Sequence, residues 1–221
     1  MALTKFNYNS FDVTPVASKA LAFNSDADGL TTAAEGSMVL IKTLTADGSG
    51  TNLTFVDGSS DVVLDNTYPI YLFKYFNIHP ATDNVIFQFN LSADTGSNYN
   101  VTKTSTCFQA FHNEADTATD LGYQGARDLA QGTGVQHLIA GCGNANDEGV
   151  SGDLYLFNPS STTFVKNFIG VGNQQTYHEY CFVNYYAGYA NTTSAVDAIQ
   201  FSTSSGNMDA GTIKMYGISD S

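Results

Sequence analysis

The chain has 221 residues, 43% of them hydrophobic, and its 21 acidic side chains outnumber its eight lysines and arginines to give a formal net charge of −13. A domain of this size buries roughly 70% of its unfolded surface, so its fold requires neither a disulfide framework nor a metal. Arg127 is the only arginine. So few cations cannot neutralise a run of phosphates, which argues against nucleic acid and against an anionic membrane surface as partners.

Targeting and membrane-spanning segments are not predicted. Residues 1–11 contain Lys5 but no apolar h-region and no small-residue cleavage site, so we expect neither a signal peptide nor a transit peptide. The longest apolar run, residues 68–78, is too short to cross a bilayer and is interrupted by Pro69 and Lys74. We therefore expect synthesis in a cytosol and no membrane partner.

The chain divides into a weakly patterned arm and a strand-rich remainder. Residues 1–36 are poor in apolar runs and contain Pro15 and a turn-like Asp-Ala-Asp-Gly at residues 26–29. From residue 37 to residue 221, short runs of Val, Ile, Phe, Tyr and Thr alternate with Gly, Asn, Asp and Ser clusters, as strands alternate with tight turns. The sequence thus predicts an all-β protein, an antiparallel jelly-roll-like β-sandwich over residues 37–221 with an extended N-terminal arm.

Twelve strands are predicted in chain order. They cover residues 38–43, 53–56, 61–64, 70–77, 84–92, 106–111, 135–140, 153–157, 163–171, 177–189, 195–202 and 212–218.

Alternation along the strands indicates which faces are buried. Every second residue from Val85 to Leu91 is apolar, whereas Gln88 and Asn90 lie on the opposite face, which predicts a strand with one wet side. Residues 70–76 and 180–186 are apolar on both faces, as expected for strands covered on two sides or placed at a subunit interface. In the last strand, Ile213 and Met215 share the face expected to complete the core.

Turn chemistry separates the strands. Asp47-Gly48, Asp57-Gly58 and Ser205-Gly206-Asn207 supply residues that tolerate a positive φ, as tight reversals require. The turn cluster at residues 79–84 makes 70–77 and 84–92 consecutive antiparallel strands. Residues 115–134 form a long connection in which one helical turn is predicted at 125–131.

The three cysteines, Cys107, Cys142 and Cys181, are far apart in sequence and form no C-x-x-C pair. A free cysteine behaves as a small hydrophobic residue, so we interpret all three as buried free thiols. The alternatives are a disulfide between two of them, or a catalytic thiol near His178.

Histidines and carboxylates provide little sign of catalysis. His79, His112, His137 and His178 are isolated, without the H-x-H or H-E-x-x-H spacing of a zinc site. G-x-S-x-G and Walker A motifs are also missing from the sequence.

Glu114 and Asp116 would share one face if their strand continued, and a carboxylate pair is what retaining glycosidases use. Jelly-roll glucanases carry a third acidic residue after such a pair, and this chain lacks it at the required place. We therefore interpret Glu114 and Asp116 as solvated charges at a loop edge, and expect no catalytic residues.

Two oxygen-rich loops could offer hard ligands to Ca²⁺. They contain Asn144, Asn146, Asp147 and Glu148 in one case, and Asn24, Asp26 and Asp28 in the other. Neither matches the twelve-residue EF-hand loop, so solvated turns are the preferred interpretation, and no metal or cofactor is expected.

Tyrosines concentrate near the longest predicted strand, at Tyr177, Tyr180, Tyr185, Tyr186 and Tyr189. Exposed tyrosines serve both protein interfaces and stacking on sugars. The chain has no tryptophan, which weakens the sugar interpretation and favours interface or core packing.

Five stretches together resemble virion structural proteins of tailed bacteriophages, especially marine phages of the cyanophage and pelagiphage kinds. They are Asn77-Ile-His-Pro-Ala-Thr-Asp-Asn84, Gly96-Ser-Asn-Tyr-Asn-Val101, Gly152-Asp-Leu-Tyr-Leu-Phe-Asn-Pro159, Asp197-Ala-Ile-Gln-Phe201 with Ser205-Gly-Asn207, and Gly211-Thr-Ile-Lys-Met-Tyr-Gly-Ile218. The resemblance spans about two-thirds of the chain and leaves the arm outside. It implies a jelly-roll or lectin-like β-sandwich displayed on the virion as a trimer or other homo-oligomer, with no catalytic residues to carry over.

The function expected from this resemblance is that of a non-enzymatic virion protein on the particle exterior, made in the host bacterial cytoplasm. It would be a capsid decoration (cement) subunit or a short fibre or knob component, with the major capsid protein or tail components as partners. The alternative is a tail-associated receptor-binding adhesin that recognises host surface glycan through a tyrosine-lined face.

Overall fold

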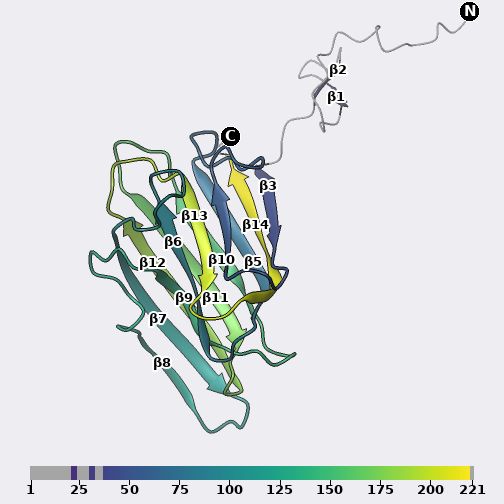
Figure 1. Cartoon of the computed structure of the whole chain (residues 1–221), viewed down its shortest axis with the longest axis vertical. Helices are drawn as coiled ribbons and strands as arrows, with labels where there is room; N and C mark the ends of the chain where they lie inside the picture. Colours follow the sequence, from purple (N-terminus) through teal and green to yellow (C-terminus); the bar gives the residue numbers. More distant parts are fainter. Residues whose placement is uncertain (1–20, 24–29, 33–36, 220–221) are drawn as a thin grey trace, which may run out of the picture. The chain divides into compact units, whose positions relative to one another are not determined.

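The computed structural model describes residues 21–23, 30–32 and 37–219, which fall into two units, Met1–Ser37 and Met38–Ser221 (Figure 1). In the first unit, β1 (Leu21–Phe23) pairs antiparallel with β2 (Leu30–Thr32). The arm therefore contains a short hairpin that its weak patterning did not predict. The turn predicted at residues 26–29 lies outside the described residues.

The second unit is a sandwich of two antiparallel sheets (Figure 1), which confirms the predicted all-β fold class. The eight-stranded sheet has the order β3 (Met38–Thr45), β14 (Met208–Ile218), β5 (Ile70–Pro80), β10 (Val150–Phe157), β11 (Lys166–Gln175), β12 (Tyr180–Ala190), β7 (Lys103–Asn113) and β8 (Thr119–Tyr123). The four-stranded sheet has the order β4 (Asn52–Val56), β13 (Ala198–Thr203), β6 (Val85–Ser92) and β9 (Gln136–Cys142). No helix among the described residues is long and apolar enough to span a membrane.

The chain passes repeatedly from one sheet to the other. β5 and β6 are consecutive, yet β5 lies in the large sheet and β6 in the small one, so the turn at residues 79–84 joins two sheets instead of closing a hairpin. The two strands have corresponding neighbours in their sheets. β5 lies between β14 and β10 in the large sheet, and β6 lies between β13 and β9 in the small sheet. The finer expectation of a jelly-roll topology stays a prediction.

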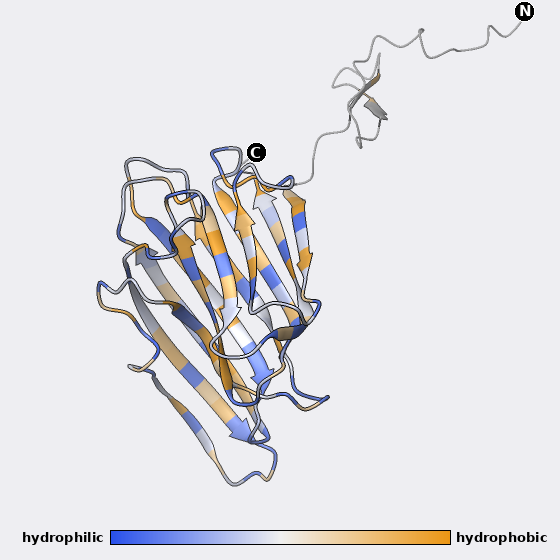
Figure 2. Ribbon diagram, viewed as in Figure 1, coloured by the Kyte–Doolittle hydropathy of each residue, from blue (hydrophilic) through white to orange (hydrophobic). Residues whose placement is uncertain are grey.

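An aromatic cluster centred on Phe201 joins the two sheets. The Phe201 ring lies 5.5 Å from Phe73 of the large sheet and 6.0 Å from Phe87 of the small sheet, centroid to centroid, and it also contacts Phe55 and Phe89. Hydrophobic and hydrophilic residues alternate along the strands (Figure 2), which gives each sheet one face that packs into this core.

The apolar face predicted for β6 is buried, but its other side is not wet. Gln88 is only 9% exposed and Asn90 only 5%. The Asn90 amide donates to the carbonyl oxygens of Tyr99 (2.5 Å) and Thr133 (3.2 Å), and its Oδ1 accepts a hydrogen bond from Lys103 Nζ (2.5 Å). The connecting segments that contain Tyr99 and Thr133 therefore cover this face, and the Asn90 side chain provides hydrogen bonds to their backbone carbonyl groups.

Eleven of the twelve predicted strands have a counterpart. Residues 61–64 form no strand, although Val62 and Leu64 are buried, because Leu64 N donates to the Asp57 carboxylate and not to a neighbouring strand. β8 was missed because its residues are mostly exposed and include Gly122. The helical turn predicted at 125–131 was wrong: the segment holds a hydrogen-bonded turn in which Arg127 N donates to Gln124 O.

The final strand contributes to the core as predicted. Ile213 and Met215 are fully buried. Gly217 continues this face, and a Cβ there would lie 2.2 Å from the ring of Tyr68, so only glycine leaves room for that ring.

We predict that Phe201→Ala will lower the free energy of unfolding by about 3–5 kcal/mol, because it removes the ring that joins the two sheets and leaves a cavity. Chemical denaturation followed by circular dichroism measures the change. Leu121→Ala is the control, since Leu121 is exposed on β8 and should alter stability by less than about 0.5 kcal/mol. Equal effects of the two substitutions would contradict this assignment of the core.

Candidate functional site

The carboxylates proposed for a glycosidase pair lie in the exposed turn between β7 and β8. Asp116 has a positive φ of 54°, and its Oδ1 lies 3.1 Å from His112 Nε2. Glu114 is also exposed. Neither residue lines one of the concave sites described below, so the geometry agrees with solvated charges at a loop edge.

The three cysteines are all free thiols. Cys107 and Cys142 are buried as predicted, and burial raises the pKa of Cys142 to about 12, which keeps it a neutral thiol. The prediction was wrong for Cys181, because the alternation of β12 turns it to the outer face of the large sheet, where it is exposed.

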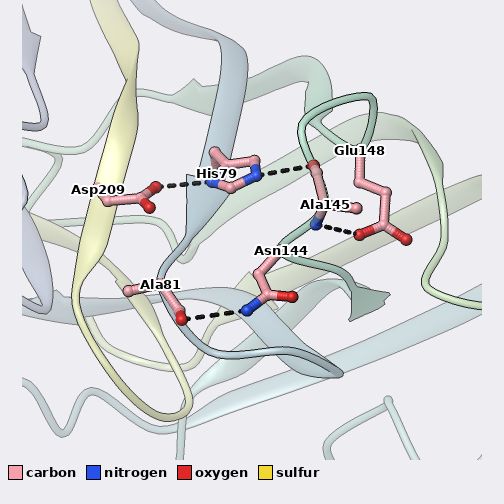
Figure 3. A network of polar contacts seen from close by, with 6 residues as sticks. All are labelled: His79, Ala81, Asn144, Ala145, Glu148 and Asp209. Carbon is pink, nitrogen blue, oxygen red and sulfur yellow. Dashed lines mark hydrogen bonds and ion pairs between the residues drawn. The ribbon is translucent and has the colours of Figure 1, made fainter.

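His79 lines a polar cavity of about 690 Å³ at one end of the sandwich. Figure 3 shows the hydrogen bonds around its ring. His79 on β5 lies between two acceptors: its Nδ1 is 2.7 Å from Asp209 Oδ1 on β14, and its Nε2 is 3.0 Å from the carbonyl oxygen of Ala145. Burial opposes protonation, but these two hydrogen bonds and the charges of Asp209 and Glu148 outweigh it and raise the pKa of His79. His79 thus ties the loop after β9 to two strands of the large sheet.

The oxygen-rich loop proposed for Ca²⁺ borders this cavity, and a hydrogen bond within the loop engages one of its carboxylate oxygens. Glu148 Oε2 accepts the N–H of Ala145 (2.7 Å), and Asn144 Nδ2 donates to Ala81 O (3.3 Å). A Cβ at Gly143 would lie 2.0 Å from the Glu148 carboxylate, so glycine there lets the carboxylate fold back over the loop. Within the described residues, no three His, Cys, Asp or Glu side chains are placed to hold a metal ion.

The second proposed Ca²⁺ loop, Asn24, Asp26 and Asp28, lies outside the described residues.

A second concave site, which we call the aromatic groove, has a volume of about 340 Å³. It lies between β9 and the turn that joins β11 to β12. Its walls include Ile86, Arg127, Tyr177, His178, Tyr180 and Phe182. The volume is near the lower end of the range for small-molecule pockets, about 300–1,000 Å³.

The turn between β11 and β12 fixes the rings of the groove. Thr176 forms a bridge with Cys142, and its Oγ1 accepts the backbone N–H groups of His178 and Tyr180. The Tyr177 and His178 rings lie 3.8 Å apart, and Tyr180 stacks on Phe111 with centroids 5.2 Å apart. The ring positions are therefore set by local hydrogen bonds and packing.

Arg127 enters the groove from the segment between β8 and β9. Its Nη1 donates to Gln109 Oε1 and, at 3.4 Å, to Asn184 Oδ1, both on the inner face of the large sheet. These partners are neutral amides, and no carboxylate among the described residues pairs with the guanidinium. Burial lowers the pKa of Arg127, but an arginine stays charged in proteins.

The five tyrosines singled out from the sequence are divided among three environments. Tyr177 and Tyr180 line the aromatic groove. Tyr186 is buried, and its hydroxyl donates to Asp153 O (2.5 Å). Tyr185 and Tyr189 point from β12 to the outer face of the large sheet.

Sequence reasoning missed the role of Arg127 and Phe182 in the groove. The signal available was that Arg127 is the only arginine of an acidic chain.

Comparison with protein families, with curated proteins and with solved structures finds no match for this chain. The resemblance to phage virion proteins therefore stays a prediction.

His79→Gln should reveal a pH-dependent contribution to stability. Because the folded-state pKa of His79 is raised, this contribution is fully present below the ordinary histidine pKa of about 6.5 and is lost as the pH rises through the folded-state value. We expect the substitution to cost about 1 kcal/mol near pH 5.5 and less near pH 8.5, as measured by urea unfolding at both pH values. His112→Gln, at an exposed histidine, is the control, and a cost for His79→Gln that is independent of pH would contradict the prediction.

Proposed function

We propose that this chain is a non-enzymatic structural subunit of a virion exterior, a capsid decoration (cement) subunit or a short fibre or knob component. It assembles through the outer face of its eight-stranded sheet, the face turned away from the core. The observation that supports this proposal is the apolar character of that face.

An apolar row crosses five strands of the outer face. Leu40 on β3, Tyr216 on β14, Leu72 on β5, Tyr155 on β10 and Ile169 on β11 are successive cross-strand partners. Leu40 is 50% exposed and Ile169 is 51% exposed. Because directly opposite residues point to the same side of a sheet, these side chains form one continuous strip.

The strip is extended by aromatic residues toward the other edge of the sheet. Tyr185 on β12, Phe108 on β7 and Tyr123 on β8 are also successive partners. The rings of Tyr185 and Phe108 stack with centroids 5.0 Å apart, and all three residues are substantially exposed.

A sheet face in contact with water normally carries polar residues. The strip is exposed at Leu40 and Ile169, half-buried at Tyr216 and Tyr155, and buried at Leu72. Apolar patches that reach the surface mark interaction sites, and protein interfaces are enriched in aromatic residues. Lys74 and Lys214, two of the eight basic side chains of the chain, are opposite each other on the same face. An acidic protein surface complements such a face, and a second copy of this acidic chain offers one. We therefore propose a homo-oligomer, with other virion proteins as further partners.

Replacing an apolar residue of the strip by a carboxylate should dissociate the oligomer. Ile169→Asp and Leu40→Asp would each bury an unpaired charge at the interface, at a cost of about 2–5 kcal/mol, or about 30-fold or more in affinity. Sedimentation velocity over a range of concentrations should give an oligomer for the wild type and a smaller species for each variant, and circular dichroism should show that each variant keeps its folded β-structure.

Phe164→Asp is the matched control, because Phe164 is 73% exposed but lies in the loop between β10 and β11. A monomeric wild type, or equal dissociation by Phe164→Asp, would refute the proposed interface.

The location on a virion has a separate test. An antibody against this chain should label purified phage particles in electron micrographs, and head or tail labelling would distinguish decoration from a fibre or knob. Failure to detect the chain in purified particles would refute the virion assignment without bearing on self-assembly.

A further inference from the structure

The aromatic groove combines rings and an unpaired cation in one concave site. We propose that it binds a glycan through a carboxylate-bearing sugar, such as a uronic or sialic acid residue, whose ring lies against the tyrosines and whose carboxylate pairs with Arg127. The site is distinct from the assembly face and does not depend on the assembly proposal.

Arg127 carries a positive charge that no carboxylate among the described residues neutralises. The guanidinium is held by the amide oxygens of Gln109 and Asn184, which orient it without neutralising it. The nearest acidic residue in sequence, Asp128, instead accepts a hydrogen bond from the Tyr123 hydroxyl. A half-buried cation without a counter-ion costs free energy, so an anion that enters the groove recovers part of that cost.

The shape of the guanidinium selects the kind of anion that binds. A guanidinium presents parallel N–H donors that match the two oxygens of a carboxylate. The Arg127 Nη1 is engaged within the protein, whereas the remaining guanidinium N–H groups have no hydrogen-bond partner among the described residues. These groups are free to bind the ligand.

Aromatic residues form one wall of the groove. Tyr177, Tyr180 and Phe182 present ring surfaces in the same groove as Arg127. One face of a sugar ring is lined by C–H groups and packs well against an aromatic ring, while its hydroxyls need polar partners. Asn84, Thr176 and His178 also line the groove and can supply them.

The charge of the whole protein restricts the ligand further. A net charge of −13 repels a polyanion that approaches the protein surface. At physiological ionic strength, exposed charges act over about 8–10 Å, so this repulsion extends beyond direct contact. The single arginine pairs with one carboxylate. These two facts favour a mostly neutral glycan with isolated acidic sugars over a densely charged polysaccharide.

The test uses the intact protein and a panel of oligosaccharides, each with one uronic or sialic acid residue, together with the carboxyl-reduced form of each. Isothermal titration calorimetry should show that at least one acidic member binds, and that carboxyl reduction weakens it by about tenfold or more, as expected for the loss of a charge-assisted hydrogen-bond pair. The comparison needs no variant, so it holds even if substitutions at Arg127 disturb the fold.

Variants then locate the site. Arg127→Gln should reduce affinity for the acidic member by about tenfold while leaving affinity for its carboxyl-reduced form unchanged. Tyr177→Ala should weaken both forms. Tyr185→Ala, at an exposed tyrosine on the opposite face of β12, is the matched control and should weaken neither.

Three results would overturn the proposal. They are equal affinity for the acidic and carboxyl-reduced forms, no binding of any acidic member at millimolar concentration, and equal losses in Tyr177→Ala and Tyr185→Ala. None of them bears on self-assembly, because Tyr177 lies outside the apolar strip and sedimentation of Tyr177→Ala should match that of the wild type.

Discussion

The difference in width between the two sheets governs the rest of this structure. Eight strands pack on four, so the small sheet can cover only part of the inner face of the large one. β9, the edge strand of the small sheet, contacts β11 and β12, and beyond it lie β7 and β8. The inner face at this end is covered by the connection from β8 to β9, which brings Arg127 over Gln109 and Asn184. The aromatic groove forms where this irregular cover meets the regular sandwich.

Edge strands and connections need partners for their backbone groups, and this need explains the buried polar residues. Asn184 donates to the carbonyl oxygen of Leu138 (3.1 Å) and Gln174 to that of Ala140 (2.6 Å), so side chains of the large sheet satisfy the backbone of β9. On the other side of the small sheet, Asn90 serves the connecting segments in the same way. An apolar residue at position 184 would leave the buried carbonyl of Leu138 without this partner, at a cost of about 1–3 kcal/mol.

The regular part of the fold could be predicted from the sequence because alternation of side chains reflects burial directly. The inward residues of β6, and Ile213 and Met215 of β14, follow that rule. Alternation does not indicate what covers the second face of a strand, so it predicts a wet face for Gln88 and Asn90, although both are buried. It also does not indicate which sheet a strand joins. The groove could not be predicted, because Arg127 and Tyr177 lie in connections without periodicity, which bring them beside Phe182 of β12.

The same alternation separates the proposed functions along a single strand. On β12, Tyr185 points to the outer face, Tyr186 points into the core, and Tyr180 and Phe182 line the groove beyond the cover of the small sheet. Under these proposals, residues of β12 one position apart would serve assembly and stability, and those a few positions nearer its start would serve ligand binding. Since opposite faces of a strand share no side-chain contacts, substitutions at Tyr185 and in the groove should act independently of each other. One tyrosine-rich strand can thus supply both an interface on its outer face and a wall of the groove on its inner face, because a substitution on one face leaves the side chains of the other unchanged.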